Sequence, residues 1–169
     1  MNGEQKKDQP FVAEAMDPLG ADSDLMAKVL FAENAPGGPE AWANMGSVAI
    51  NRLKSGKFGK SLKAVLMGMS SAVKTKSKQW EKANKAEFND YEQRVFNKIT
   101  EVTDKLVGGQ IPDTVKGATH FENLNRYPLP YWAKDMDAVH RDRGDPRWSQ
   151  TYFKSKEISD GNGQGRPQK

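Results

Sequence analysis

The sequence contains no cysteine, and its only two histidines are His120 and His140. Without cysteine the chain can form no disulfide, no thiolate zinc site and no cysteine nucleophile. The two histidines do not form an HExxH pair or any similar ligand spacing, so we expect neither a metal nor another cofactor. The GxSxG motif of serine hydrolases and the phosphate-binding loops GxxxxGK(S/T) and GxGxxG are absent as well. Among the side chains that carry enzyme chemistry, carboxylates therefore remain.

Long apolar runs are also missing. The first 20 residues are polar and charged, and they hold no apolar stretch as long as the core of a signal peptide. No later segment approaches the length and hydropathy of a membrane span. We therefore expect synthesis in the cytoplasm, without a signal peptide and without a membrane span.

Acidic residues are scarce between Lys54 and Lys85. This segment holds nine lysines and one acidic residue, Glu81, whereas the net charge of the whole chain is only +4. Such a segment attracts polyanions at long range, with a strong dependence on salt. Nucleic acid and an anionic cell-wall polymer are both candidate ligands, and a solvated lysine-rich face without a ligand is the alternative.

Apolar residues at three- and four-residue spacing predict a largely helical chain. The first helix is expected to begin near Asp22 or Ser23, both good N-caps, and to continue through DLMAKVLFAEN. Pro36 and the two glycines after it end this helix. Two further helices are expected in PEAWANMGSVAINRLKSG and SLKAVLMGM.

The middle of the chain has a less regular pattern. Residues 70–88 show weak periodicity, and we expect them to form an exposed, irregular segment. Asp90 and Gln93 resemble a capping box. This box would open the longest helix, YEQRVFNKITEVTDKLV, which has one apolar stripe: Tyr91, Val95, Ile99, Val102 and Leu106.

The character of the sequence changes towards the C-terminus. ATHFEN and QTYFK are predicted to be short strands, and the segments YPLPYWAKDM and HRDRGDPRW are predicted to separate them as loops. The expected fold is mainly α (α+β), with a small β- and loop-rich lobe near the C-terminus. We expect a polar N-terminal arm at 1–20, one compact domain at 21–154 and a flexible polar tail at 155–169.

Glu33 stands out among the carboxylates because of its place in the first helix. Met26, Val29 and Leu30 define an inward stripe, and Glu33 follows at the spacing where the next apolar residue would be expected. A carboxyl group at the edge of the core suits a general acid, because partial burial favours its protonated form. Alternatively, the helix frays before Glu33 and the side chain simply reaches water.

Glycoside cleavage commonly uses two carboxylates. Glu40, Asp135, Asp137 and Asp145 are available as partners, but their positions single out none of them. The C-terminal part is also rich in aromatic residues that suit either stacking on sugars or packing of a small lobe: Phe121, Tyr127, Tyr131, Trp132, Trp148 and Tyr152.

Five segments of the chain carry motifs in a recognisable order. VLFAENAPGGPEAWANMGSVAINRLKSGKF has an apolar-Ala-Glu motif, a Gly/Glu turn and a helix that ends in Asn-Arg. It is followed by SSAVKTKSKQW, by KGATHFENL with the pattern Gly-Ala-x-x-Phe-x-Asn, by PYWAKDM with Pro-x-Trp, and by TYFK. In this order and spacing the motifs resemble the SleB and CwlJ type of bacterial cell-wall hydrolases. The resemblance covers roughly residues 25–154.

The resemblance implies a lysozyme-like fold and cleavage of the β-1,4 bond between N-acetylmuramic acid and N-acetylglucosamine. The acidic residue of the family's first motif falls on Glu33. Several such enzymes are lytic transglycosylases, in which one glutamate acts as acid and then as base while the C6 hydroxyl of the muramic acid attacks the anomeric carbon. That reaction needs no second protein carboxylate.

The same resemblance assigns roles to further residues. Asn51 and Arg52 match the helix-ending pair, and we expect them to have a structural role by bonding the loop that follows Glu33. The residues expected to line or support the glycan groove are Trp80, Thr119, His120, Phe121, Asn123 and Trp132.

Peptidoglycan glycan strands are the expected partner, and the segment Lys54–Lys85 is expected to hold the enzyme near anionic wall polymers. A phage lysis system or a virus particle would bring such an enzyme to the wall, which makes other virion proteins further candidate partners. Two alternatives remain at this point. One is a muramidase that uses a second carboxylate and water, and the other is an inactive wall- or DNA-binding structural protein of a virus particle.

Overall fold

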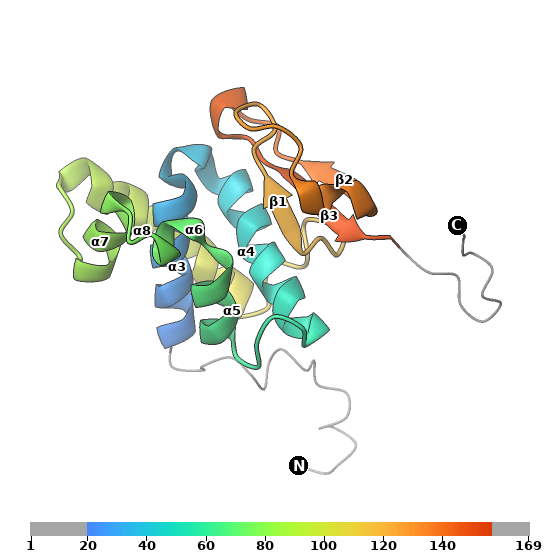
Figure 1. Ribbon diagram of the computed structural model, residues 1–169. Helices are drawn as coiled ribbons and strands as arrows, with labels where there is room; N and C mark the ends of the chain where they lie inside the picture. The colour runs from blue at the N-terminus through green and yellow to red at the C-terminus, as the bar shows by residue number, and fades with distance from the viewer. Residues whose placement is uncertain (1–19, 157–169) are drawn as a thin grey trace, which may run out of the picture.

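The computed structural model describes residues 20–156, so the predicted N-terminal arm and most of the predicted tail lie outside the described residues. Within these described residues, six α-helices come first: α3 (Ala21–Asn34), α4 (Gly38–Ser55), α5 (Leu62–Met69), α6 (Ser71–Lys74), α7 (Lys78–Lys85) and α8 (Asp90–Val107). Three strands follow: β1 (His120–Glu122), β2 (Met136–Arg141) and β3 (Thr151–Ser155). The predicted fold class, mainly α with a small β-containing lobe near the C-terminus, is confirmed (Figure 1).

Helix α3 lies at the centre of the helical part and packs against α4, α5, α7 and α8. Its predicted inward stripe is confirmed, because Met26, Val29 and Leu30 are fully buried. The lack of a side chain at Gly46 lets α4 and α8 pack closely, because a Cβ at this position would lie only 2.5 Å from Cδ1 of Leu106. This tight packing holds α4 close against α8 in the core.

The segment predicted to be irregular, residues 70–88, is the main error in the helical part. It forms α6 and α7, and α7 packs on α3. Trp80 and Ala83, three positions apart on α7, are 6% and 1% exposed, and the Ser77 hydroxyl caps the helix by accepting from the Trp80 N–H. Two buried residues on one face suffice to anchor so short a helix, although they are too few to give a clear period in a lysine-rich sequence.

Helix α8 was predicted correctly in extent but not in detail. Its capping box consists of Asn89 and Glu92, one residue before the predicted pair Asp90 and Gln93. On the predicted stripe, Tyr91 is 66% exposed because the first turn of α8 extends beyond the core.

The three strands form an antiparallel sheet in the order β1-β3-β2. Residue His120 pairs with Phe153 and Glu122 with Thr151, and β2 pairs with the other edge of β3 with an irregularity between Ala138 and His140. Strand β2 was missed, since it runs from the end of one segment predicted to be a loop, through residues 137–139, into the start of the other. Its pattern of exposure is irregular, as expected where a bulge interrupts the alternation.

A buried carboxylate joins the sheet to the helical part. Asp142 is 6% exposed and accepts hydrogen bonds from Asn44 of α4 (2.7 Å), from the Gln150 N–H (2.9 Å) and from the Tyr152 hydroxyl (3.0 Å). Burial raises the pKa of Asp142, and these donors partly oppose the effect. Burial, together with the Asp142 charge, raises the pKa of Tyr152 well above its usual value. The cluster fixes α4 relative to β3, the strand that pairs with β1.

Within residues 20–156, no helix has both the length and the apolar character needed to cross a membrane.

Candidate active site

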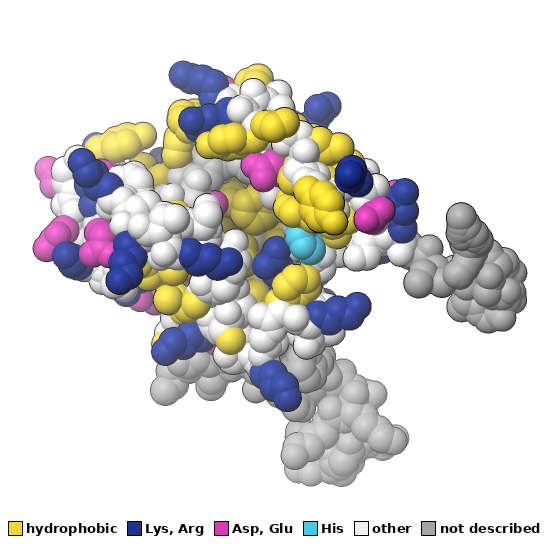
Figure 2. All heavy atoms as spheres, viewed as in Figure 1, with side chains coloured by type: hydrophobic (Ala, Val, Ile, Leu, Met, Phe, Trp, Pro, Cys, Tyr) yellow, Lys and Arg dark blue, Asp and Glu magenta, His cyan; other side chains and the backbone are white. Residues whose placement is uncertain are grey.

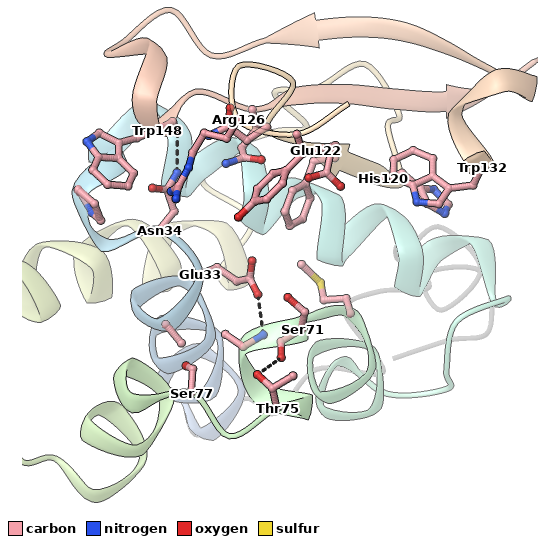
Figure 3. A pocket seen from close by; sticks show the side chains of 18 of the residues that line it. Glu33, Asn34, Ser71, Thr75, Ser77, His120, Glu122, Arg126, Trp132 and Trp148 are labelled. Atoms are coloured by element: carbon pink, nitrogen blue, oxygen red, sulfur yellow. Dashed lines mark hydrogen bonds between the residues drawn. The ribbon is translucent and has the colours of Figure 1, made fainter. Parts of the chain in front are cut away.

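A cleft of about 850 Å³ lies between the helical part and the sheet. The C-terminal end of α3 and helix α6 form one side, and β1 with the loop after it forms the other (Figure 3). The molecular surface is hollowed on this face, and hydrophobic side chains gather above the hollow (Figure 2). The cleft is therefore accessible from this face of the molecule.

Glu33 lies in the wall of this cleft and is half-buried. Its Oε2 accepts two hydrogen bonds, one of 2.5 Å from the Ser70 hydroxyl and one of 3.2 Å from the Ala72 N–H. No hydrogen bond to Oε1 is found from any described residue. Helix α3 extends through Glu33 to Asn34, so the alternative in which the helix frays before Glu33 is wrong. One oxygen is thus held in place, and the other remains available to a ligand.

Asn34, the next residue, ties the end of α3 to the opposite side of the cleft. Its Nδ2 donates to the Trp148 carbonyl (2.9 Å), and its own carbonyl accepts from Nε1 of Trp42 (2.9 Å). Gly37 lies against the Asn34 side chain, since a Cβ at Gly37 would be only 2.7 Å from Asn34 Cγ. The Pro-Gly-Gly segment therefore has a second role besides ending α3. Gly37 leaves room for the Asn34 side chain, which joins the end of α3 to the loop that carries Trp148.

Aromatic rings lie at both ends of the cleft. Trp132 packs on His120 at one end (ring centroids 4.9 Å apart), and Trp148 lies at the other end, near Asn34 (Figure 3). Burial, and after it the charge of Arg52, lowers the pKa of His120, so its ring is neutral at pH 7. Glu33 lies between these two aromatic ends.

Asn51 and Arg52, the predicted helix-ending pair, have the structural role expected of them, but they bond a different segment of the chain. Asn51 donates to the Ala118 carbonyl (2.9 Å) and Arg52 to the Thr119 carbonyl (2.6 Å). Both bonds hold the segment that leads into β1, not the loop after Glu33, so the predicted partner was wrong. The cause is that α4 carries this pair at its far end, beside the start of the sheet, whereas the loop after Glu33 lies at its near end.

Most of the predicted groove residues come together in the cleft. His120, Phe121, Asn123 and Trp132 line it. Asn123 is 6% exposed and donates to the Arg147 carbonyl (2.9 Å), so it supports the loop above the cleft. Thr119 does not line the cleft, but its hydroxyl lies 3.0 Å from Nδ1 of the lining residue His120. It therefore belongs to the supporting group.

Trp80 does not belong to the cleft, and its prediction as a sugar contact was wrong. It is 6% exposed and packs in the core beneath α3. The reason is the unexpected helix α7, which turns this side chain inwards.

None of the carboxylates considered as a partner for Glu33 lines the cleft. Glu40 is paired with Arg143, and Asp145 is paired with Arg147. A carboxylate that was not considered does line it: Glu122, the last residue of β1. Burial, and to a smaller extent the charge of Glu33, raises the pKa of Glu122, against the opposing effect of the Asn123 N–H. Its position two residues after His120 on a strand, on the same face, was the signal available in the sequence.

This combination of a fixed carboxylate, an open cleft and flanking aromatic rings is typical of enzymes that cleave polysaccharides. The model of the Cell Wall Hydrolase family matches residues 38–158. Since this is more than half of the 169 residues, the chain belongs to that family, and the resemblance seen in the sequence is confirmed. The match includes Glu122 but begins after Glu33.

No match was found among curated proteins or among solved structures. The lysozyme-like arrangement implied by the family resemblance therefore stays a prediction beyond the confirmed fold class.

Proposed function

We propose that this protein cleaves the β-1,4 bond between N-acetylmuramic acid and N-acetylglucosamine in peptidoglycan, with Glu33 as the general acid. One observation carries the proposal: a half-buried carboxylate in the wall of an open cleft has one oxygen fixed by two donors and the other free of described donors. A carboxyl group held in this way suits proton transfer to a glycosidic oxygen. Membership of the Cell Wall Hydrolase family supports the choice of substrate.

The reaction that we favour is that of a lytic transglycosylase. Glu33 donates its proton to the glycosidic oxygen while the bond from this oxygen to C1 of the muramic acid breaks. The C6 hydroxyl of the same sugar attacks C1, and the Glu33 carboxylate takes up the hydroxyl proton. The products are a 1,6-anhydro-muramic end and a free C4 hydroxyl on N-acetylglucosamine, so a single carboxylate serves as acid and then as base.

The aromatic ends of the cleft give the glycan strand two stacking surfaces. Trp132 with His120 would bind a sugar on one side of Glu33, and Trp148 would bind a sugar on the other. Phe121 adds apolar surface to the cleft, Arg52 holds the Thr119 carbonyl beside His120, and Asn123 holds the Arg147 carbonyl beside Trp148.

A hydrolytic muramidase is the second candidate. It requires a further carboxylate that activates water, and the presence of Glu122 in the same cleft is the observation that favours it. Mass spectrometry of the released fragments distinguishes the two reactions, because only transglycosylation leaves anhydro-muramic ends.

The lysine-rich segment supports attachment to anionic wall polymers. Of its nine lysines, all except Lys82 are exposed. Lys82 is paired with Glu92 and Lys85 with Glu81. The remaining seven lysines therefore attract anionic polymers more strongly than these two. Binding to purified wall sacculi and to duplex DNA, compared across a range of salt concentrations, tests this assignment and also the alternative of a DNA-binding structural protein. A preference for DNA would contradict the wall assignment.

Delivery to the wall as part of a phage lysis system or a virus particle remains our expectation. Detection of the protein in purified virus particles by mass spectrometry would test it, and would identify any virion proteins that bind it.

The central experiment is the substitution Glu33→Gln, which nearly keeps the shape of the side chain and removes the proton donor. We expect the rate of glycan release from purified peptidoglycan to fall about 10²- to 10⁴-fold. Glu101→Gln, which changes an exposed carboxylate on α8, serves as the matched control and should cleave at the normal rate. A Glu33→Gln protein with the normal rate would disprove the proposed function.

A further inference from the structure

Glu122 lies across the cleft from Glu33. Glu33 comes from α3 and Glu122 from β1, and the two side chains lie on opposite sides of the same space (Figure 3). In the sheet formed by residues 20–156, β1 is an edge strand that pairs with β3, and Glu122 lies opposite Thr151. His120 is on the same face of β1 as Glu122, because side chains alternate along a strand. Glu122 is thus placed beside the ring pair of His120 and Trp132 and opposite the proposed acid.

The two cleft carboxylates differ from several other acidic residues because they have no ion-pair partner among the described residues. Among residues 20–156, no lysine or arginine forms an ion pair with Glu33 or with Glu122, whereas Glu40, Glu81 and Glu92 each have one. Burial raises the pKa of Glu122, and the negative charge of Glu33 raises it further. A half-buried carboxylate that lies near a second negative charge and has no ion-pair partner is unfavourable for folding alone, and carboxylates placed like Glu122 are typical of sites that transfer protons.

We propose that Glu122 is a second catalytic carboxylate, which activates a water molecule for attack on the glycosidic carbon opposite Glu33. This inference rests on the proposed function, because it requires Glu33 to act as the acid. Glu122 takes a proton from water while the water oxygen forms a bond to C1 of the muramic acid. The bond from C1 to the glycosidic oxygen breaks, and that oxygen receives the proton of Glu33. The products are a reducing muramic end and a free C4 hydroxyl on N-acetylglucosamine.

Water and the C6 hydroxyl therefore compete for the same carbon. Glu33 acts in both reactions, whereas Glu122 acts only when water is the nucleophile. The enzyme is expected to release fragments with reducing ends together with fragments with anhydro ends. The ratio of reducing to anhydro ends measures the catalytic contribution of Glu122. If Glu122 only bound a sugar hydroxyl, its loss would raise KM and leave this ratio unchanged.

The test compares fragments released from purified peptidoglycan by the unmodified protein, Glu122→Gln and the control Glu101→Gln. For Glu122→Gln we expect the ratio of reducing to anhydro ends to fall about 10²-fold, within the range usual for loss of a general base. Glu122→Asp keeps the carboxylate on a shorter side chain and should restore part of the reducing ends. The control should keep the normal ratio.

The pH dependence of the unmodified protein gives a second measurement that needs no variant. Charged or titratable side chains facing Glu122 across or along the cleft are Glu33, Arg52, His120, Arg126 and Tyr127. As pH falls through the raised pKa of Glu122, the base becomes protonated, so the share of reducing ends should fall and anhydro ends should dominate.

Two results would overturn the proposal while leaving Glu33 as the acid. One is an unmodified protein that releases only anhydro ends across the pH range. The other is a Glu122→Gln protein with an unchanged ratio of the two ends. Failure of the proposed function itself gives a different result, namely normal release of both ends by Glu33→Gln.

Discussion

The Ser70 hydroxyl donates a hydrogen bond of 2.5 Å to Oε2 of Glu33. The same Oγ accepts from the Val73 N–H (3.2 Å), so Ser70 caps α6 while it holds the carboxylate. Ser70 is fully buried. The position of the proposed acid is therefore coupled to the start of a helix that belongs to a different part of the sequence.

Replacement of Ser70 by alanine should lower the rate of glycan cleavage about 10- to 100-fold, because a hydrogen bond to a charged group contributes about 1.5–3 kcal/mol. The Ala72 N–H still holds Oε2, which limits the loss. Steady-state release of fragments from purified peptidoglycan measures the effect.

Ser61→Ala is the matched control for this variant. Ser61 caps α5 in the same way, by accepting from the Ala64 N–H (3.1 Å), but it does not contact Glu33. Both variants should lose about 1 kcal/mol of stability through the missing cap, and only Ser70→Ala should lose activity. Equal activity in the two proteins would contradict the positioning role of Ser70.

The two tryptophans predicted to contact sugars should behave differently. Trp80 is buried in the core, so Trp80→Ala is expected to lower the free energy of unfolding by about 3–5 kcal/mol. Trp132 lines the cleft, so Trp132→Ala is expected to raise KM for glycan strands about tenfold through loss of stacking, with a smaller effect on stability. Chemical denaturation and substrate-dependence of the rate measure the two effects.

Trp132→Phe provides the control, since it keeps an aromatic face in the cleft and should recover most of the binding. If Trp132→Ala left KM unchanged, the aromatic end formed with His120 would have no part in binding.

The position of Glu33 on the inward face of α3 could be predicted from the sequence because its signal is local. The stripe of Met26, Val29 and Leu30 defines an inward face over two helical turns, and Glu33 is on that face. Ser70 could not be predicted as its partner, because the contact joins residues 37 positions apart. Glu122 was hidden for a similar reason: its relation to Glu33 appears only when the sheet folds over the end of α3.

The errors in residues 70–88 and in β2 have a common physical cause. Helix α7 is short and carries only two buried side chains, Trp80 and Ala83, and β2 is interrupted by a bulge. In both cases tertiary packing stabilises an element whose own sequence pattern is too short or too irregular to predict it. The longer helices α4 and α8 were predicted because each repeats its pattern over several turns.

Asp142→Asn should test how the sheet is joined to α4. The amide has only one oxygen to accept from Asn44, Gln150 and Tyr152, so at least one buried donor loses its partner, and we expect a loss of about 1–3 kcal/mol. Thermal or chemical unfolding measures the change. Asp137→Asn, which alters an exposed residue of β2, is the control and should have little effect.

The pH dependence of this difference follows from the raised pKa of Asp142. The native state binds the proton more tightly than the unfolded state, so the contribution of Asp142 to stability is greatest at low pH and is lost as pH rises through its folded pKa. Because Asn does not titrate, the gap in stability between the unmodified protein and Asp142→Asn should be wider at pH 4 than at pH 7 on this linkage argument. A gap that widened with rising pH would contradict the direction of the shift.

Gly37→Ala should disturb the cleft without altering any residue that lines it. The added Cβ would lie 2.7 Å from Asn34 Cγ and closer still to its Nδ2, so the side chain must move away from the Trp148 carbonyl. We expect a loss of about 1–3 kcal/mol in stability, together with lower activity, because the end of α3 is no longer tied to the far side of the cleft. The backbone of Gly37 has a φ of −72°, which alanine adopts freely, so the effect must come from the contact.

A double substitution isolates this contact. Asn34→Ala alone removes the hydrogen bond to Trp148, and with the Asn34 side chain gone the alanine at position 37 meets only Ala41 Cβ, at 3.0 Å. The pair Asn34→Ala and Gly37→Ala should therefore be about as stable as Asn34→Ala by itself, which is a coupling of the kind expected for residues in contact. Gly68→Ala, on α5 with no neighbour within 4 Å, should be neutral or slightly stabilising. Additive losses in the double variant would show that Gly37 acts through something other than the Asn34 side chain.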